Sequence, residues 1–424
     1  MTQSCFRVIL VGAGDRGMIY AKESLCPNAD FQIVAVVEPM QFRRDAAGEL
    51  FNIAPSRRYA SVAQATREGK FADAAFICTM DKQHADTAIP FMELGYHILL
   101  EKPIAPGPED TQRIIACARQ HHSIVMVCHV LRYAPFYTEI KKRIAAGELG
   151  CILNIQMAEQ VSYYHMSVSY VRGKYGDPGI SGSGMLLSKC SHDLDLMVWF
   201  MNGEKPTQVY SVGSLQQFKP ENAPAGAAER CLPGCAYRDT CPYSAKMLYV
   251  DHPQRWANRV WNDCGLRNAD EPAKLRSLAE ADNQYGRCVY RTNMKIVDHQ
   301  SVLVAFESGA TATLNMVGGA SAAGRTLRII GTRGELEGSF EQERFAVHHI
   351  APEAAGGRVT EIIDVSAQQK GDAHGGGDAR LLSDFWALLR GEEASICCTS
   401  LERSIIGHEI AYQAEACRNA GSKI

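Results

Sequence analysis

Three glycines near the start of the chain have the spacing of a phosphate-binding turn. Gly12, Gly14 and Gly17 form the pattern G-x-G-x-x-G directly after the apolar run VILV. In such a turn the first glycine permits a tight bend, the second lets the backbone approach a pyrophosphate, and the third lets the next helix pack closely. The first N–H groups of that helix then face the anion. The sequence therefore predicts a dinucleotide site.

A carboxylate follows the next apolar run at the distance that a ribose-binding acid requires. Residues 31–37 (FQIVAVV) end at Glu38, close to the separation of about 20 residues expected in this motif. A carboxylate here would accept hydrogen bonds from the adenosine ribose and repel a 2′-phosphate. We therefore expect NAD rather than NADP, although Arg43 and Arg44 lie close enough in the sequence to keep NADP open.

A lysine and a histidine further along have the chemistry of a dehydrogenase site. Lys102 follows the apolar run YHILL, at the carboxyl end of a predicted parallel strand, where such sheets bind ligands. His192 lies in the run GMLLSKCSHDLD. Oxidation of an alcohol needs a base tuned near the working pH and a cation beside the developing alkoxide. A solvated lysine and a histidine bonded only to backbone are the alternatives.

The elements that must position these residues form two groups. Strand and helix patterns alternate up to about residue 126, which predicts an α/β fold whose N-terminal Rossmann domain, residues 1–126, is a doubly wound parallel sheet. Longer β-rich runs then predict a substrate-binding and oligomerisation α+β domain, residues 127–424, with a large, mostly antiparallel sheet. Helices are expected within residues 378–420 at its end. The runs that predict the second sheet are 207–212, 299–306, 310–317 and 327–331.

Composition excludes several classes of partner. The 424 residues are 46% hydrophobic and 21% charged, with a net charge of −3. The absence of basic blocks argues against nucleic acid and anionic membranes as partners. An opening that enters a strand directly, without a long apolar run, predicts a cytoplasmic protein without a secretory signal or spanning helix.

The motifs together resemble the Gfo/Idh/MocA oxidoreductases. The resemblance rests on the glycine turn, Glu38, His84, the segment GYHILLEKP at residues 95–103 and the run at residues 184–195, and it covers most of the chain. It implies that Lys102 hydrogen-bonds the substrate hydroxyl and that His192 takes or relays its proton. The cofactor-binding residues are then expected to be Gly12, Gly14, Asp15, Arg16, Gly17, Glu38, Thr79, His84, Glu101 and Lys102.

The run around His192 departs from the pattern that it resembles. Many relatives have an aspartate four residues before the histidine, where this chain has Ser188. A serine cannot supply the charge of a carboxylate. Lys189 therefore becomes a second candidate for contacting substrate hydroxyls, and Asp195 could share a helix face with His192.

Aromatic and cationic side chains near the predicted domain junction suit a sugar. Tyr164, His165 and Arg172 combine flat rings with groups that bind hydroxyls, and His299 begins a predicted strand that could line the pocket. An interface between domains or subunits has the same composition.

The sequence favours an NAD-dependent oxidoreductase that acts on a secondary alcohol of a sugar, glycoside or cyclitol. The first alternative is a redox-assisted glycosidase that oxidises C3, eliminates the anomeric group, adds water and restores the alcohol with recycled NAD; its candidate bases are His165, Tyr164 and His299. The second is an NAD-binding sensor without turnover. A homodimer or homotetramer is expected, as in members of the family that the chain resembles.

Cysteines form a compact cluster in the second half. Cys231, Cys235 and Cys241 have the spacing C-x3-C-x5-C, and Cys288 could complete a structural zinc site, for which Cys264 or a histidine are alternatives. An iron–sulfur cluster or unliganded thiols stay open. The fifteen cysteines of a chain without an export signal favour thiols over disulfides.

Overall fold

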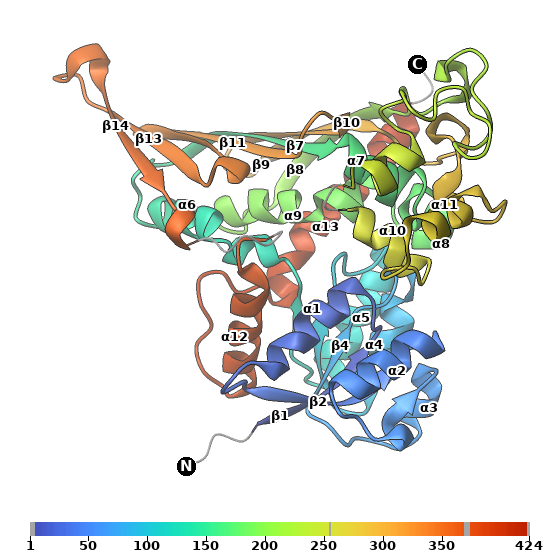
Figure 1. Cartoon of the computed structure of the whole chain (residues 1–424). Helices are drawn as coiled ribbons and strands as arrows, with labels where there is room; N and C mark the ends of the chain where they lie inside the picture. Colours follow the sequence, from blue (N-terminus) through green and yellow to red (C-terminus); the bar gives the residue numbers. More distant parts are fainter. Residues whose placement is uncertain (1–4, 254–255, 369–373, 422–424) are drawn as a thin grey trace.

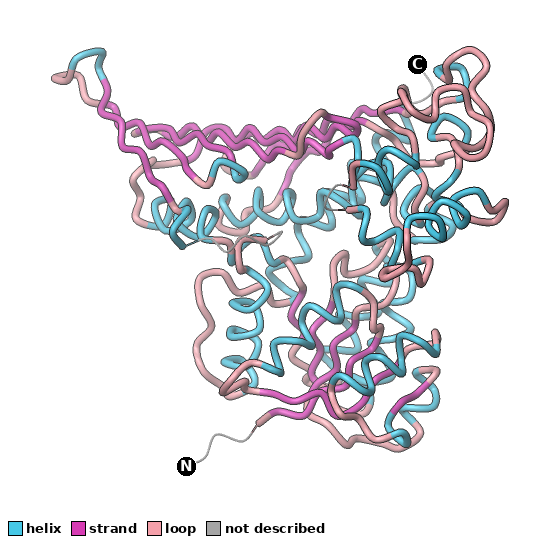
Figure 2. Tube along the Cα trace, viewed as in Figure 1, coloured by secondary structure: helices cyan, strands magenta, loops and turns pink. Residues whose placement is uncertain are grey.

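The computed structural model describes residues 5–253, 256–368 and 374–421. Its strands form one six-stranded and one eight-stranded sheet, which occupy opposite ends of the molecule in Figure 1. Figure 2 shows helices between and beside the two sheets. No helix among the described residues is long and apolar enough to cross a membrane.

The first sheet is parallel throughout and has the order β3-β2-β1-β4-β5-β6. Its central strands are apolar on both faces because helices cover both, so they read as continuous apolar runs in the sequence. Its strands are β1 (Phe6–Val11), β2 (Phe31–Val37), β3 (Arg58–Tyr59), β4 (Ala74–Ile77), β5 (His97–Leu100) and β6 (Val125–Val127). The helices between them are α1 (Asp15–Lys22), α2 (Gln41–Leu50), α3 (Val62–Thr66), α4 (His84–Glu93) and α5 (Pro108–Gln120).

The second sheet has the order β14-β13-β12-β11-β7-β10-β9-β8. Its neighbours are antiparallel except for β7 and β10, which run parallel. The two sheets confirm the predicted fold class. The strands of the second sheet are β7 (Ile152–Ser162), β8 (Pro206–Ser214), β9 (His299–Phe306), β10 (Thr311–Ala320), β11 (Gly324–Gly331), β12 (Gly334–Ser339), β13 (Arg344–Ile350) and β14 (Arg358–Asp364).

Helices cover the face of the second sheet that is turned toward the first. Helices α6 (Pro135–Ala145), α9 (Met185–Phe200) and α13 (Leu401–Gly421) lie beneath this sheet in Figure 1, and α9 packs against β7, β10 and α13. Almost every side chain of α9 is buried, because the helix is enclosed by the sheet on one side and by other helices elsewhere.

Helix α12 (Gly377–Leu389) belongs to the C-terminal part of the chain but packs beside the first sheet. The ring of Trp386 stacks on Phe6 with centroids 5.1 Å apart, and it also contacts Phe31 and Phe76. The C-terminal part therefore contributes to the core around the N-terminal sheet.

A long insertion joins β8 to β9 and carries the cysteine cluster. It contains α10 (Ala257–Asp263) and α11 (Glu271–Ala279), and it lies beside the short helices α7 (Tyr163–His165) and α8 (Pro178–Ser181) in Figure 1. A small apolar cluster of its own includes Tyr249, Val260 and Trp261.

Candidate active site

The glycine turn closes tightly on itself and stays open where a phosphate would enter. Gly12 has φ +92°, and a Cβ there would lie 2.5 Å from the Cys78 oxygen; a Cβ on Gly17 would lie 2.1 Å from the Gly12 oxygen. A Cβ on Gly14 would meet nothing within 4 Å. Gly12 and Gly17 thus have backbone atoms packed against them, which leave no room for a side chain. The space at Gly14 is open, as a bound pyrophosphate requires.

Two further groups fit a dinucleotide. The carboxylate of Glu38 accepts hydrogen bonds from the backbone N–H of Ala13 at 2.9 Å and of Met40 at 3.0 Å, which places it beside the turn at the end of β2. The buried hydroxyl of Thr79, just after β4, has no hydrogen-bond partner within the described residues. An unsatisfied buried hydroxyl at the carboxyl end of a parallel strand is a fitting contact for a ligand.

Both arginines that kept NADP open are engaged within the protein. Arg43 forms an ion pair with Asp263 at 3.1 Å, and Arg44 donates to the backbone oxygen of Glu38 at 2.6 Å. The carboxylate of Glu38 and these engaged arginines favour NAD.

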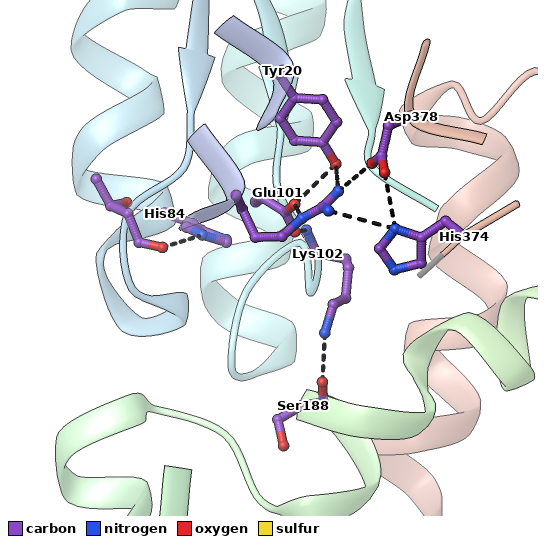
Figure 3. A network of polar contacts seen from close by, with 9 residues as sticks. Tyr20, His84, Glu101, Lys102, Ser188, His374 and Asp378 are labelled. Carbon is purple, nitrogen blue, oxygen red and sulfur yellow. Dashed lines mark hydrogen bonds and ion pairs between the residues drawn. The ribbon is translucent and has the colours of Figure 1, made fainter. Parts of the chain in front are cut away.

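Lys102 reaches across from the nucleotide-binding half to the helix that carries His192. The Lys102 ammonium donates to the backbone oxygen of Ser188 at 2.5 Å, as Figure 3 shows. Ser188 precedes His192 by one turn of α9. A lysine that follows β5 thus reaches the helix that carries His192, and its charge acts on that histidine.

The electrostatics of this pair suit proton transfer. Burial lowers the pKa of Lys102 below its ordinary value, although the carboxylates of Glu101 and Asp81 act in the opposite direction. Burial, and then the charge of Lys102, lower the pKa of His192 well below its ordinary value. The His192 ring is therefore neutral near pH 7, and its buried Nδ1 has no hydrogen-bond partner among the described residues.

Arg16 anchors a polar network near Lys102, and Figure 3 shows its partners Tyr20, Glu101 and Asp378. Its guanidinium donates to Glu101 at 2.7 Å, to Asp378 at 2.5 Å and to the hydroxyl of Tyr20. Arg16 and Glu101 were expected to contact the cofactor, but the structure shows their side chains bonded to each other. Tyr20 and Asp378 were missed, because nothing in the local sequence marks them as partners of Arg16.

A second imidazole also lies at the site. The ring of His374 lies 6.0 Å from that of His192, measured between centroids, and its Nδ1 lies 3.0 Å from a carboxylate oxygen of Asp378. The sequence signal that could have found it is the spacing in HGGGD, where a histidine and an aspartate lie four residues apart at the start of a helix.

His84 lies behind the site. Its Nδ1 is 2.7 Å from the backbone oxygen of Pro103 and its Nε2 is 3.3 Å from that of Thr79, and the ring is fully buried. Both nitrogens face main-chain carbonyls, so His84 supports the segment after β5 instead of reaching toward a cofactor.

Lys189 is held in a buried group of charges. Its ammonium pairs with Glu159 on β7 at 2.9 Å, and Glu159 also pairs with Arg325 on β11 at 2.7 Å. Arg325 in turn pairs with Asp193 at 2.9 Å. Lys189, a predicted substrate contact, is close enough for its charge to lower the pKa of Lys102. Its own ammonium is already paired with Glu159.

Two predicted substrate residues are not brought to the site. Asp195 accepts two hydrogen bonds from Arg132, both at 2.6 Å, and the pair is buried. Arg172 is buried against the insertion, where it donates to the backbone oxygen of Tyr243, the hydroxyl of Tyr249 and other groups. Their charged ends are satisfied inside the protein, which corrects the expectation that they face a sugar.

The other predicted substrate residues lie at the insertion and at the sheet. The ring of His165 stacks on Trp256 with centroids 3.8 Å apart, and Tyr164 packs beside the apolar cluster of the insertion. His299 begins β9, where its Nδ1 lies 2.9 Å from a carboxylate oxygen of Asp298.

The predicted zinc site is not supported. Cys231, Cys235, Cys241 and Cys288 line one small cavity, yet no group of three or more His, Cys, Asp or Glu side chains in the described part of the chain is placed to hold a metal ion. A hydrogen bond of 3.5 Å joins the Cys231 sulfur to Arg172. All fifteen cysteines are free thiols.

Known proteins match both halves of the chain. A family model described as "Oxidoreductase family, NAD-binding Rossmann fold" matches residues 6–129, and one described as "GFO/IDH/MocA C-terminal domain" matches residues 137–232. YteT of Bacillus subtilis strain 168, which is named as an oxidoreductase, is 24% identical to this chain over 322 residues. The match covers 74% of this chain and 72% of YteT. The scyllo-inositol 2-dehydrogenase (NAD(+)) of the same organism is 25% identical over 201 residues, 47% of this chain and 54% of its own length.

Solved structures share the fold over nearly the whole chain. A levoglucosan dehydrogenase in complex with NADH and levoglucosan has a TM-score of 0.69 at 18% identity, covering 98% of this chain and 97% of that one. The aldose-aldose oxidoreductase of Caulobacter crescentus has a TM-score of 0.64 at 15% identity, with the same coverage. Because the two family models together match more than half of the chain, it belongs to the Gfo/Idh/MocA family of NAD-binding oxidoreductases.

Proposed function

We propose that the protein oxidises a secondary alcohol of a sugar or cyclitol. The observation that carries this proposal is the hydrogen bond from Lys102 to α9, which brings its charge to act on His192, together with the open glycine turn. Relatives named as inositol and levoglucosan dehydrogenases support the substrate class. Gly12, Gly14, Gly17, Glu38 and Thr79 would hold the dinucleotide.

Each residue has a defined task in this reaction. Bound NAD⁺ supplies the hydride acceptor for the carbon-bound hydrogen. Lys102 donates a hydrogen bond to the substrate hydroxyl and stabilises the negative charge that develops on its oxygen. The neutral ring of His192 takes the hydroxyl proton, so a C–H and an O–H bond break as the C=O bond forms. Lys189, positioned by Glu159, would bind a neighbouring hydroxyl.

A panel assay tests this proposal. Purified protein is mixed with NAD⁺ and with myo-inositol, scyllo-inositol, levoglucosan, glucose and methyl glucosides in turn, and NADH absorbance is followed. Formation of NADH with at least one polyol supports the proposal. Silence across the panel, with NAD⁺ binding intact, would instead favour the sensor.

A redox-assisted glycosidase is the second candidate, because the site holds one more imidazole than a dehydrogenase needs. Once a ketone forms at C3, a base can remove the C2 proton and the anomeric group can leave; water then adds and the ketone is reduced again. His374, next to His192 and oriented by Asp378, is better placed for this proton than His165 or His299. Release of nitrophenol from nitrophenyl glycosides without net NADH would identify this route.

We further propose a homo-oligomer formed through the uncovered face of the second sheet. Tyr210, Val212 and Leu303 are exposed apolar side chains on neighbouring strands β8 and β9. Continuous apolar surface of this kind marks interaction sites. Light scattering on the eluted protein would give the number of subunits, and a monomer at all concentrations would contradict the proposal.

A further inference from the structure

Helix α10 of the insertion contacts the nucleotide-binding half at two places. The side chain of Asp15 lies 3.3 Å from Arg259 Nε and 3.4 Å from Asn262 Nδ2. The last residue of α10, Asp263, pairs with Arg43 at 3.1 Å. Three polar side chains of one short helix thus reach across to the Rossmann sheet.

The partners of α10 belong to two different parts of the predicted dinucleotide site. Asp15 lies between Gly14 and Gly17 in the glycine turn, where a pyrophosphate would bind. Arg43 lies in the first turn of α2, five residues after the ribose acid Glu38. Helix α10 therefore spans the path between the phosphate end and the ribose end of this site.

Further contacts outside the nucleotide-binding half hold α10 in place. The guanidinium of Arg259 lies over the ring of Trp256, 5.1 Å from its centroid, and also donates to Ser169 at 3.1 Å. Asp263 accepts a hydrogen bond from Tyr285 at 2.6 Å, and Trp261 donates to the backbone of Tyr249. Because these contacts already hold α10 in place, less conformational entropy of the helix is lost when a ligand binds beside it.

We propose that α10 is a strap that holds the dinucleotide on the protein, with Arg259 as a phosphate-binding residue supplied by the insertion. The acidic side chain of Asp15 opposes an anion in the turn, and Arg259 neutralises it. A guanidinium has five N–H donors, and its bonds to Asp15 and Ser169 use two of them. The remaining donors suit a pyrophosphate.

Slow exchange of the cofactor follows from this arrangement. A dinucleotide enclosed between the turn, Glu38 and α10 can leave only after the contacts of α10 with Asp15 and Arg43 break. Retention would let one bound cofactor be reduced and reoxidised repeatedly. The inference rests on the dinucleotide site and is independent of which alcohol is oxidised.

Release of NADH from the full-length protein tests the strap directly. NADH is bound, displaced with excess NAD⁺ in a stopped-flow instrument, and followed by energy transfer from the tryptophans, of which Trp256 and Trp261 lie at α10. We expect Arg259→Gln and Arg43→Gln each to speed release by roughly tenfold or more, because truncating one partner of such a pair acts mainly on dissociation. Arg267→Gln, an exposed arginine of the same insertion, is the matched control and should leave the rate within about twofold.

Two controls distinguish loss of the strap contacts from unfolding of the insertion. Melting curves of the unliganded variants show whether the insertion is still folded, and Arg43→Gln tests the strap from the Rossmann side, where the insertion itself is unaltered. Release rates equal to wild type in both variants would overturn the proposal. The measurement needs no substrate, so a failed sugar assay would count against the proposed function alone.

Discussion

The ammonium of Lys102 hydrogen-bonds the backbone oxygen of Ser188, one helical turn before His192. Lys102 belongs to the nucleotide-binding half and Ser188 to the helix beneath the second sheet, so this contact joins the two halves at the site. It also holds the Lys102 ammonium against α9, the helix that carries His192.

Removal of the Lys102 side chain should abolish turnover but not cofactor binding. We expect Lys102→Ala to lower kcat by at least about a hundredfold, the usual scale for a group that stabilises an alkoxide or transfers a proton. Titration of the variant with NADH should give a Kd close to that of wild type. Near-normal turnover would exclude Lys102 from the reaction.

The pH profile should report the depressed pKa values of both groups. Because burial lowers the pKa of His192, the base stays neutral below its ordinary value of 6.5, and kcat/KM should decline only at lower pH. Because burial lowers the pKa of Lys102 from its ordinary 10.5, activity should fall on the alkaline side before that pH.

Ser188→Asp, which restores the carboxylate found in many relatives, should move the acid limb of this profile upward. A negative charge next to His192 favours the imidazolium, so the base would stay protonated to higher pH. Ser188→Asn is the neutral control of similar size. An unchanged acid limb in the aspartate variant would show that His192 is not the group titrating there.

Acid stability should depend on Arg16. Burial raises the pKa of Asp378 and of Glu101, but Arg16 outweighs it and lowers both below their ordinary values. Their contribution to folding is therefore complete above an unfolded pKa of about 4 and is lost as the pH falls toward the folded values.

Arg16→Met should reduce the free energy of unfolding at pH 7 by about 2 kcal/mol, less than for a fully buried pair because a quarter of the side chain is exposed. Urea titrations at pH 7 and pH 3 would measure it, and the difference between wild type and variant should shrink at pH 3. Arg113→Met, which breaks a surface pair with Asp86, is the control and should cost under about 1 kcal/mol. An equal loss at both pH values would contradict this account.

Metal removal should leave the insertion folded. The cysteines around Cys231 line a cavity, and among the described residues they do not form a set of ligands for a metal ion. Arg172 instead donates a hydrogen bond to the Cys231 sulfur. We expect an unchanged Tm after treatment with a strong chelator and no stoichiometric zinc by elemental analysis. A zinc content near one per chain would restore the metal site.

The nucleotide-binding half was predictable because its signals are local. A buried parallel strand is one continuous apolar run, and the glycine turn follows β1 directly, so strand, turn and helix are read in order. Strands β12 and β14 were missed because β12 (GELEGS) has a single large apolar side chain and β14 (RVTEIID), although partly apolar, is exposed at nearly every position. Without alternation of apolar and polar residues, no pattern marks them.

The partners of a side chain could be predicted only where they also lie close to it in the chain. Lys102 and His192 were named from family motifs and stay predictions, whereas the partner of Asp195 is Arg132, 63 positions away. Likewise, Arg172 looked available for a sugar because its partners Tyr243 and Tyr249 lie in a distant insertion. His374 and Asp378 reach the site only through the placement of α12.

That placement of α12 has a consequence during synthesis. Trp386 covers Phe6, Phe31 and Phe76, so these aromatic rings remain open to water until the ribosome has made nearly the whole chain. The first sheet to be synthesised is thus among the last to have its core covered. A nascent chain halted before residue 377 would expose an aromatic, aggregation-prone surface to chaperones.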